Sequence, residues 1–136
     1  MDKKDCIFCK IIKGEIPSYK IYENEFVYAF LDIAKDCYGH TLVIPKNHCE
    51  NFFDAKEKDL CEVIKAIKLI SSHYKTVGFD AVNIINASGK EAEQSVFHLH
   101  FHIIPRKEDD GLKVFPTLLG TSEELSAQCE KLKIKE

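Results

Sequence analysis

Residues 97–105 read FHLHFHIIP, in which histidines and apolar side chains alternate strictly as far as Ile103. Successive side chains of a β-strand point to opposite faces, so this period of two predicts a strand over 97–105. His98, His100 and His102 would then line one face of a sheet, and the apolar residues between them would pack into a core on the other. The segment therefore requires a sheet with one buried face and one face that carries polar chemistry.

Short strands are predicted on both sides of one long helix. Apolar and β-branched patterns indicate strands at 20–23, 26–32 and 40–45, and a further strand at 79–87 precedes the histidine segment. The connections are of hairpin length, which predicts an antiparallel sheet of about five strands. Together with the helices, this arrangement is an α+β fold.

Two helices are predicted, one long and one short. Over 54–77, apolar residues recur at spacings of three and four, with Ile64 among them, and Asp54 is placed to cap the first turn. A short helix is predicted over 5–13, with Asp5 as its cap.

Length and composition indicate one domain over 1–136, with the motifs within about 5–107 and a polar, partly mobile tail over 108–136. The net charge of −3 argues against a general nucleic-acid binder. No apolar run is long enough to span a bilayer, and no secretory signal is evident. We therefore predict a cytoplasmic protein with reduced thiols, without a nucleic-acid or membrane partner. The chain is also short for a dinucleotide-binding fold.

The histidine face allows two chemical interpretations. Three imidazoles could hold a catalytic metal ion, as in some zinc hydrolases. Alternatively, the middle imidazole, His100, acts as a nucleophile toward phosphorus while an acceptor on its other nitrogen fixes its tautomer. The preceding loop favours the second interpretation, because Asn86, Gln94 and Ser95 offer uncharged polar groups that suit a phosphate.

The sequence is similar to the histidine triad (HIT) family. Residues 94–104, QSVFHLHFHII, resemble the family motif His-φ-His-φ-His-φ-φ, where φ is apolar, with its Gln-Ser-Val lead-in. Further blocks extend the resemblance over about 5–107, namely CIFCKII (6–12), AFLDI (29–33), GHTLVIPK (39–46) and NIINASG (83–89). The resemblance implies an HIT-like fold and a homodimer whose sheets join.

The resemblance also implies a nucleotide hydrolase or nucleotidyl transferase that acts at the α-phosphorus of a purine nucleoside 5′-phosphate derivative. His100 would form a covalent nucleotidyl-histidine intermediate, His98 would orient it, and His102 would contact the phosphate or the leaving group. Eight further residues are placed around the substrate by the resemblance: Asp32 at the ribose, Phe8, Phe30 and Ile33 at the base, Asn86, Gln94 and Ser95 at the phosphate, and His40 near the triad.

Two alternatives stay open from the sequence. The leaving group is an amine in the phosphoramidase branch, which the Gln-Ser-Val lead-in and the N-terminal block resemble. It is a nucleotide in the dinucleoside polyphosphate hydrolases, which the continuation through Arg106 resembles. A module that binds a nucleotide without turnover is the alternative of another class.

Cys6 and Cys9 form a C-x-x-C pair, which is half of a tetrahedral zinc site. The pair is also compatible with two packed helix cysteines or with a redox dithiol. Zinc-containing relatives add a histidine after an Ile-Pro-Lys strand and the first triad histidine, so the resemblance assigns these roles to His48 and His98. We therefore expect a structural zinc that holds the N-terminal helix against the sheet, and no organic cofactor.

Overall fold

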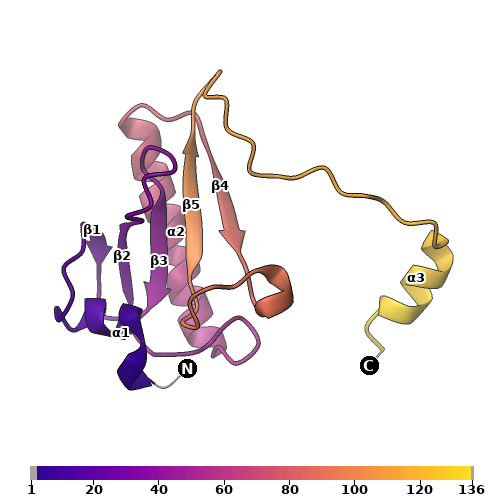
Figure 1. The fold of residues 1–136 in the computed structure, drawn as a ribbon, viewed down its shortest axis with the longest axis horizontal. Coiled ribbons are helices and arrows are strands. Elements are labelled where there is room, and N and C mark those ends of the chain that lie inside the picture. The colour runs from indigo at the N-terminus through magenta and orange to yellow at the C-terminus, as the bar shows by residue number, and fades with distance from the viewer. Residues whose placement is uncertain (1–2, 136) are drawn as a thin grey trace.

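The computed structural model describes residues 3–135 and contains a five-stranded antiparallel sheet in the order β1-β2-β3-β5-β4 (Figure 1). The predicted α+β fold is confirmed. The strands are β1 (Lys20–Glu23), β2 (Val27–Leu31), β3 (Thr41–Pro45), β4 (Ala81–Asn86) and β5 (Phe101–Arg106). All except β1 are shorter than predicted, because pairing with their neighbours ends before the apolar pattern does.

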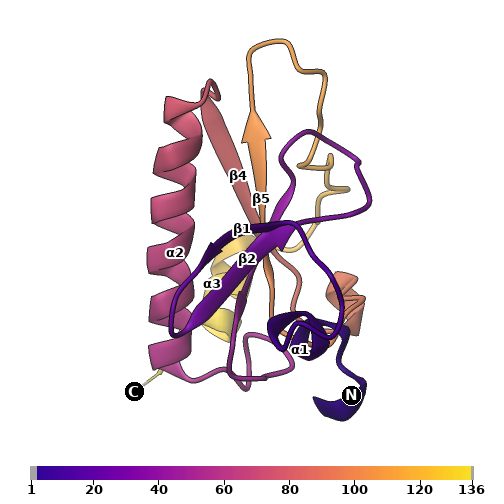
Figure 2. The same ribbon diagram turned by 90° about the vertical axis from the view of Figure 1, so that its left-hand side faces the viewer.

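Helix α2 (Glu57–Thr76) covers one face of the sheet (Figure 2). Its buried side chains form one core cluster with alternate residues of the strands and of the segment before β5: Val27, Ala29, Val43, Val63, Ala66, Ile67, Ile70, Tyr74, Leu99, Phe101 and Ile103. Ile64, predicted within the apolar stripe, is instead about half exposed at the edge of this contact.

The start of α2 differs from the prediction. The helix begins at Glu57, and its N-cap residue is Lys56, which makes no side-chain capping bond. The carboxylate of Asp54 instead accepts hydrogen bonds from the backbone N–H groups of Glu50 (3.0 Å) and Asn51 (2.9 Å) in the preceding turn. The predicted Asp54 cap is therefore wrong, because its oxygens bond the backbone of the preceding turn and not the N–H groups of the helix.

Helix α1 (Ile7–Ile12) lies on the opposite face of the sheet (Figure 2). Its N-cap is Cys6 and not the predicted Asp5, which belongs to the short turn η1 (Lys3–Asp5). Gly14 ends the helix with φ +79°, and the backbone N–H groups beyond it return to the last turn in a Schellman arrangement. Residues of α1, β2 and β3 form the second core cluster: Cys6, Phe8, Cys9, Ile11, Tyr28, Phe30, Leu42 and Ile44.

The histidine segment is only partly a strand. β5 begins at Phe101 rather than at residue 97, because Phe101 is the first residue of the segment to pair with β3 and β4. Before it, the N–H of Leu99 donates to the carbonyl of Cys49 at 2.9 Å. The alternation nevertheless holds, since Leu99 and Phe101 face α2 while His98 and the other triad histidines turn to the opposite face.

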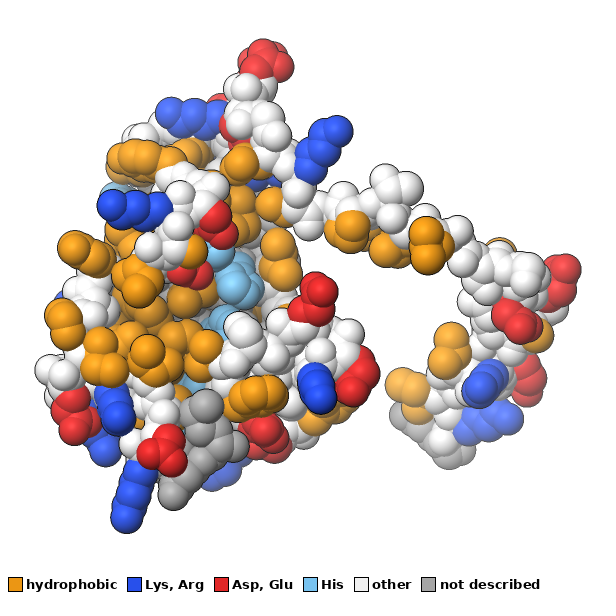
Figure 3. Space-filling view, in the orientation of Figure 1, with side chains coloured by type: hydrophobic (Ala, Val, Ile, Leu, Met, Phe, Trp, Pro, Cys, Tyr) orange, Lys and Arg blue, Asp and Glu red, His pale blue; other side chains and the backbone are white. Residues whose placement is uncertain are grey.

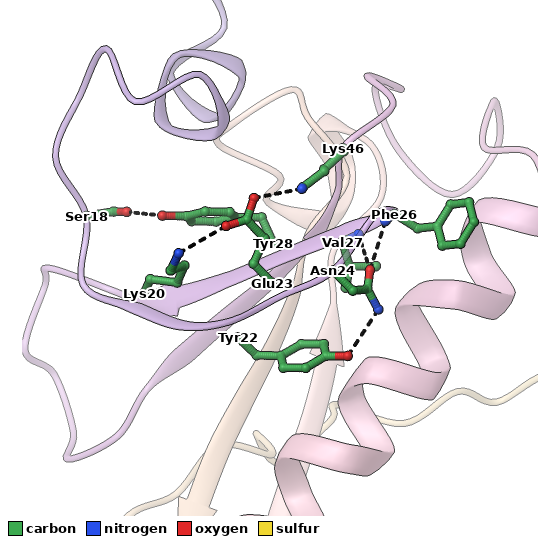
Figure 4. A network of polar contacts seen from close by, with 9 residues as sticks. All are labelled: Ser18, Lys20, Tyr22, Glu23, Asn24, Phe26, Val27, Tyr28 and Lys46. Carbon is green, nitrogen blue, oxygen red and sulfur yellow. Dashed lines mark hydrogen bonds and ion pairs between the residues drawn. The ribbon is translucent and has the colours of Figure 1, made fainter.

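The β1–β2 hairpin carries a polar network at one edge of the sheet (Figure 4). Asn24 Oδ1 accepts the backbone N–H groups of residues 26 and 27 at 2.8 and 2.9 Å, which fixes the turn. Glu23 bonds Lys46 at 2.7 Å and Lys20 at 3.1 Å, and these ammonium groups lower its pKa. The pairing register also shifts within β1. A charged and irregular edge of this kind resists pairing with a further strand.

The tail contains an element that sequence patterning did not predict. Helix α3 (Leu125–Leu132) lies apart from the sheet (Figure 1), and none of its described residues is buried. No helix within residues 3–135 is long and apolar enough to cross a membrane.

Candidate functional site

A cleft of about 330 Å³ lies between α1, β2 and the segment that leads into β5. This size is within the usual range for small-molecule sites. Figure 3 shows histidine side chains in a hollow bordered by hydrophobic side chains on this face. The lining residues include seven of the predicted site residues: Phe8, Phe30, Asp32, Ile33, Ser95, His100 and His102.

His100 is held with one ring nitrogen toward the protein and one toward the cleft. Its Nδ1–H donates to the carbonyl of His98 at 2.8 Å, so Nε2 carries the lone pair. The ring packs edge-on against Phe8, with centroids 5.3 Å apart. Burial lowers the pKa of His100, which keeps the imidazole neutral and its lone pair available near pH 7. A neutral, oriented imidazole is what nucleophilic attack on phosphorus requires.

His102 lies next to His100 in the cleft, and a histidine outside the cleft forms a hydrogen bond to its ring. Its Nδ1 is 2.8 Å from Nε2 of His40, whose Nδ1 is 2.7 Å from the carboxylate of Asp36. Burial lowers the pKa of His102 to about 4. His40, predicted among the substrate-binding residues, does not line the described cleft and is connected to it by the hydrogen bond to His102.

The backbone before β3 places His40 behind the cleft. Gly39 has φ +80°, and a Cβ there would stand 3.0 Å from Cγ of Pro105, so the position requires glycine. The carbonyl of His40 accepts the N–H of Asp32 at 2.8 Å. Asp32 is fixed further because its Oδ1 accepts the N–H of Ala34, which leaves the carboxylate at the mouth of the cleft.

Two predicted phosphate ligands, Asn86 and Gln94, bond backbone groups in this structure. Gln94 is buried, and its amide bonds the carbonyls of Glu50 (2.6 Å) and Val96 (3.0 Å) and the N–H of Gly89 (2.8 Å). Asn86 donates to the carbonyl of His100 at 2.9 Å. Among the described residues neither side chain lines the cleft. Substrate binding by these two residues stays a prediction, and in this structure their amides bond the backbone around the triad.

Cys6, Cys9, His48 and His98 come together at the base of α1, with their ligand atoms within 4.8 Å of one another. Each cysteine Sγ is 3.3 Å from one histidine Nδ1, and the two Nδ1 atoms are 3.2 Å apart. Zn–S and Zn–N bonds of normal length at tetrahedral angles would give S···N of about 3.6 Å and N···N of about 3.3 Å. The donor set and its spacing therefore fit zinc.

The other nitrogen of His98 supports this arrangement. Its Nε2–H donates to the carbonyl of Pro45 at 2.8 Å, which leaves the Nδ1 lone pair facing the cysteines. Burial lowers the pKa of His98 to about 4, so the ring is neutral. The residue thus faces the sulfur atoms with its side chain and His100 with its main-chain carbonyl.

The alternative of a metal held by all three triad histidines is not compatible with this geometry. Both nitrogens of His98 are directed away from the cleft, and Nδ1 of His100 is bonded to a carbonyl. Within residues 3–135, no cluster of ligand atoms combines His98, His100 and His102.

Comparisons with known proteins indicate one family. A model of the HIT domain matches residues 13–109. An uncharacterized HIT-like protein of Methanocaldococcus jannaschii is 54% identical over 78% of this chain and 82% of its own length. The adenosine 5′-monophosphoramidase of Schizosaccharomyces pombe is 39% identical over 96% of this chain and 97% of its own. A Zn-bound histidine triad family protein from Mycobacterium smegmatis superposes with a TM-score of 0.79 at 35% identity, over 83% of both chains.

Proposed function

Because this chain belongs to the HIT family, we propose that it hydrolyses purine nucleoside 5′-phosphate derivatives at the α-phosphorus through a covalent intermediate on His100. The observation that carries this proposal is the orientation of His100. Its Nδ1–H is bound to the carbonyl of His98, and its ring lines the cleft. The neutral Nε2 of His100 is therefore a nucleophile whose lone pair is fixed in direction.

The reaction has two displacements at phosphorus. In the first, the lone pair of His100 Nε2 forms a bond to the α-phosphorus, and the bond to the leaving group breaks with its electron pair. The leaving group takes up a proton from solvent. In the second, water forms a bond to the same phosphorus and gives up a proton that reaches solvent, the bond to His100 breaks, and its electron pair returns to Nε2 as the nucleoside 5′-phosphate is released.

The other cleft residues bind and orient the substrate. The carboxylate of Asp32 at the cleft mouth is an acceptor for the two ribose hydroxyls. Phe8, Phe30 and Ile33 provide apolar surface for the base, and Ser95 offers a hydroxyl to the phosphate. An apolar slot of this kind favours a purine through its larger buried area, without a hydrogen-bond code for one base.

An amine leaving group is favoured over a second nucleotide. The fission-yeast relative is named as an adenosine 5′-monophosphoramidase. Arg106, the residue available to reach additional phosphates, bonds Asp110 at 2.8 and 2.9 Å and Asn83 at 2.8 Å, and it does not line the described cleft. Dinucleoside polyphosphate hydrolysis by the same mechanism is the second candidate, because the sequence beyond the triad resembles that branch.

The test is AMP release from adenosine 5′-phosphoramidate by the wild type, His100→Ala and the control His73→Ala, an exposed histidine on α2. We expect turnover by the wild type and by the control, and a loss of at least about 10³-fold in His100→Ala. Acid-quenched wild type should contain a nucleotidyl group on His100 by peptide mass spectrometry. A His100→Ala variant with normal turnover would refute the mechanism, and tight AMP binding without any turnover would favour a binding module.

We further propose a structural zinc ion held by Cys6, Cys9, His48 and His98. Zinc supplies a fixed tetrahedral link between α1 and the sheet, and four protein ligands leave no position for substrate. The relative from Mycobacterium smegmatis, named as Zn-bound, supports this assignment.

We also propose a homodimer in which two copies join along β4. The sheet has two edges, β1 and β4. The β1 edge is charged and irregular, whereas β4 carries no charged residue and pairs with β5 in unbroken register. Ile84 in the middle of β4 is half exposed. An uncharged, regular edge favours pairing with an identical strand.

A further inference from the structure

The carboxylate of Asp36 lies outside the cleft and is bonded to a buried histidine. Asp36 is in the loop between β2 and β3, with more than half of its side chain exposed. Its Oδ1 is 2.7 Å from Nδ1 of His40, and this hydrogen bond lowers the pKa of Asp36. Nε2 of the same ring is 2.8 Å from Nδ1 of His102, which lines the cleft. An exposed carboxylate is thus connected to the site through two rings.

These separations indicate shared protons and not a metal ion. Ligand atoms around a tetrahedral zinc ion lie about 3.3 to 3.6 Å apart, as in the cysteine–histidine cluster. The distances of 2.7 and 2.8 Å along Asp36, His40 and His102 are those of hydrogen bonds. Asp32 also faces His40, but its carboxylate is 3.8 Å from Nε2, beyond hydrogen-bonding distance.

The donor and the acceptor of each hydrogen bond follow from the carboxylate of Asp36, which is the first group of the series. An ionised carboxylate only accepts, so the bond to Asp36 requires a proton on Nδ1 of His40. In the neutral ring, Nε2 of His40 then holds the lone pair, and Nδ1 of His102 must donate to it. This leaves the second nitrogen of His102, Nε2, as an acceptor.

We propose that Asp36 is a positioning residue that fixes the tautomer of His40 and thereby presents the Nε2 lone pair of His102 to the cleft. The inference deepens the proposed function, on which its kinetic part rests. In the second displacement, His102 Nε2 takes a proton from the attacking water as the new P–O bond forms. The electron pair of the P–N bond returns to His100, and the proton on His102 passes to solvent after AMP leaves.

The loop allows this role to be separated from folding. The backbone of His40 is held by Gly39 and by the hydrogen bond from Asp32, independently of the Asp36 side chain. Because Asp36 is exposed, its replacement removes the acceptor of His40 and leaves the core packing intact.

The test combines tautomer measurement with kinetics on the full chain. Long-range ¹H–¹⁵N NMR reports which nitrogen of each histidine carries the proton, in the wild type, Asp36→Ala and Asp36→Asn. Asn retains an acceptor oxygen and should keep His40 protonated on Nδ1, whereas Ala should shift His40 toward the Nε2–H form. With adenosine 5′-phosphoramidate we expect kcat of Asp36→Ala to fall on the order of tenfold, with a parallel fall in KM, kcat/KM nearly unchanged and a burst of ammonia before steady state, because only the second displacement is slowed. The control is Glu25→Gln, which removes an exposed carboxylate from the β1–β2 turn.

Unchanged His40 and His102 tautomers in Asp36→Ala would overturn the inference, as would an Asn variant that behaves like the Ala variant. An equal loss of kcat in Glu25→Gln would also overturn it, because a general charge effect would then explain the result. If the wild type hydrolyses no nucleotide, the proposed function fails, and the tautomer shift still decides the role of Asp36.

Discussion

Removal of zinc should destabilise this protein first and inactivate it second. Helix α1 has only six residues, well below the roughly 12 to 15 that an isolated helix needs in water. It is connected to His48 and His98 through Cys6 and Cys9, which stand at its N-cap and in its first turn. Chelation would therefore release α1, and the same helix supplies Phe8 to the cleft.

The size of the effect follows from binding linkage. A ligand present at about 1,000 times its dissociation constant stabilises the folded state by about 4 kcal/mol. For a chain of 136 residues, each kcal/mol changes Tm by about 4 °C, so removal of zinc should lower Tm by about 16 °C. AMP release should fall in parallel with the fraction of protein that loses α1.

Differential scanning calorimetry of the wild type, with stoichiometric zinc and after EDTA treatment, measures this change. Cys9→Ser should melt like the chelated wild type under both conditions. Cys61→Ser, which replaces an exposed cysteine on α2, should melt like the zinc-loaded wild type. Equal melting temperatures with and without EDTA, or no zinc by metal analysis, would refute the reasoning.

Four further outcomes are expected. Phe8→Ala should cost about 3–5 kcal/mol in urea unfolding and weaken AMP binding by calorimetry, whereas Phe8→Leu should retain most of both. Leu99→Ala, at a fully buried position facing α2, should cost about 2–5 kcal/mol in the same assay and leave KM unchanged. Because the folded pKa of His102, about 4, is below its unfolded value, the unfolded chain binds more protons between about pH 6.5 and 4. The free energy of unfolding should therefore decrease as the pH falls through that window, by at most ~3 kcal/mol from this residue. His102→Gln should remove that part of the pH dependence of urea unfolding. Ile84→Lys on the β4 edge should convert a dimer to a monomer by light scattering, and an unchanged mass would exclude this edge as the interface.

The histidine alternation illustrates what patterning can predict. The period of two correctly assigns Leu99 to the α2 side and His98 to the other, but it extends the strand too far. A period reports how side chains alternate along an extended backbone, whereas a strand also needs a neighbour for its N–H and C=O groups. Here the pairing with neighbouring strands begins only at Phe101, and the N–H of Leu99 donates to the carbonyl of Cys49 instead.

The candidate site was predictable where a residue type limits the chemistry. The resemblance assigned Cys6 and His48 to one metal site, and the structure places them in one cluster although they are far apart in sequence. The bonds of Gln94 to backbone groups were not predicted, because an amide in a loop suits a phosphate and a backbone carbonyl equally well, and only burial distinguishes them. Asp36 was missed because an exposed aspartate in a loop carries no periodic signal, and its partner lies four residues on through a turn that depends on Gly39.

The sheet separates two sets of side chains that will tolerate sequence drift unequally. On the α2 side, residues such as Val63 and Ile67 belong to a buried cluster and do not line the described cleft, and volume-conserving exchanges there usually cost less than about 1.5 kcal/mol. On the α1 side, Phe8 and Phe30 are at once core residues and walls of the cleft. An exchange on the α2 side changes stability alone, whereas an exchange on the α1 side changes both stability and substrate binding. Evolution of new substrate specificity in this chain should therefore begin with substitutions on the α1 face. Stabilising substitutions on the α2 face would offset their cost in stability.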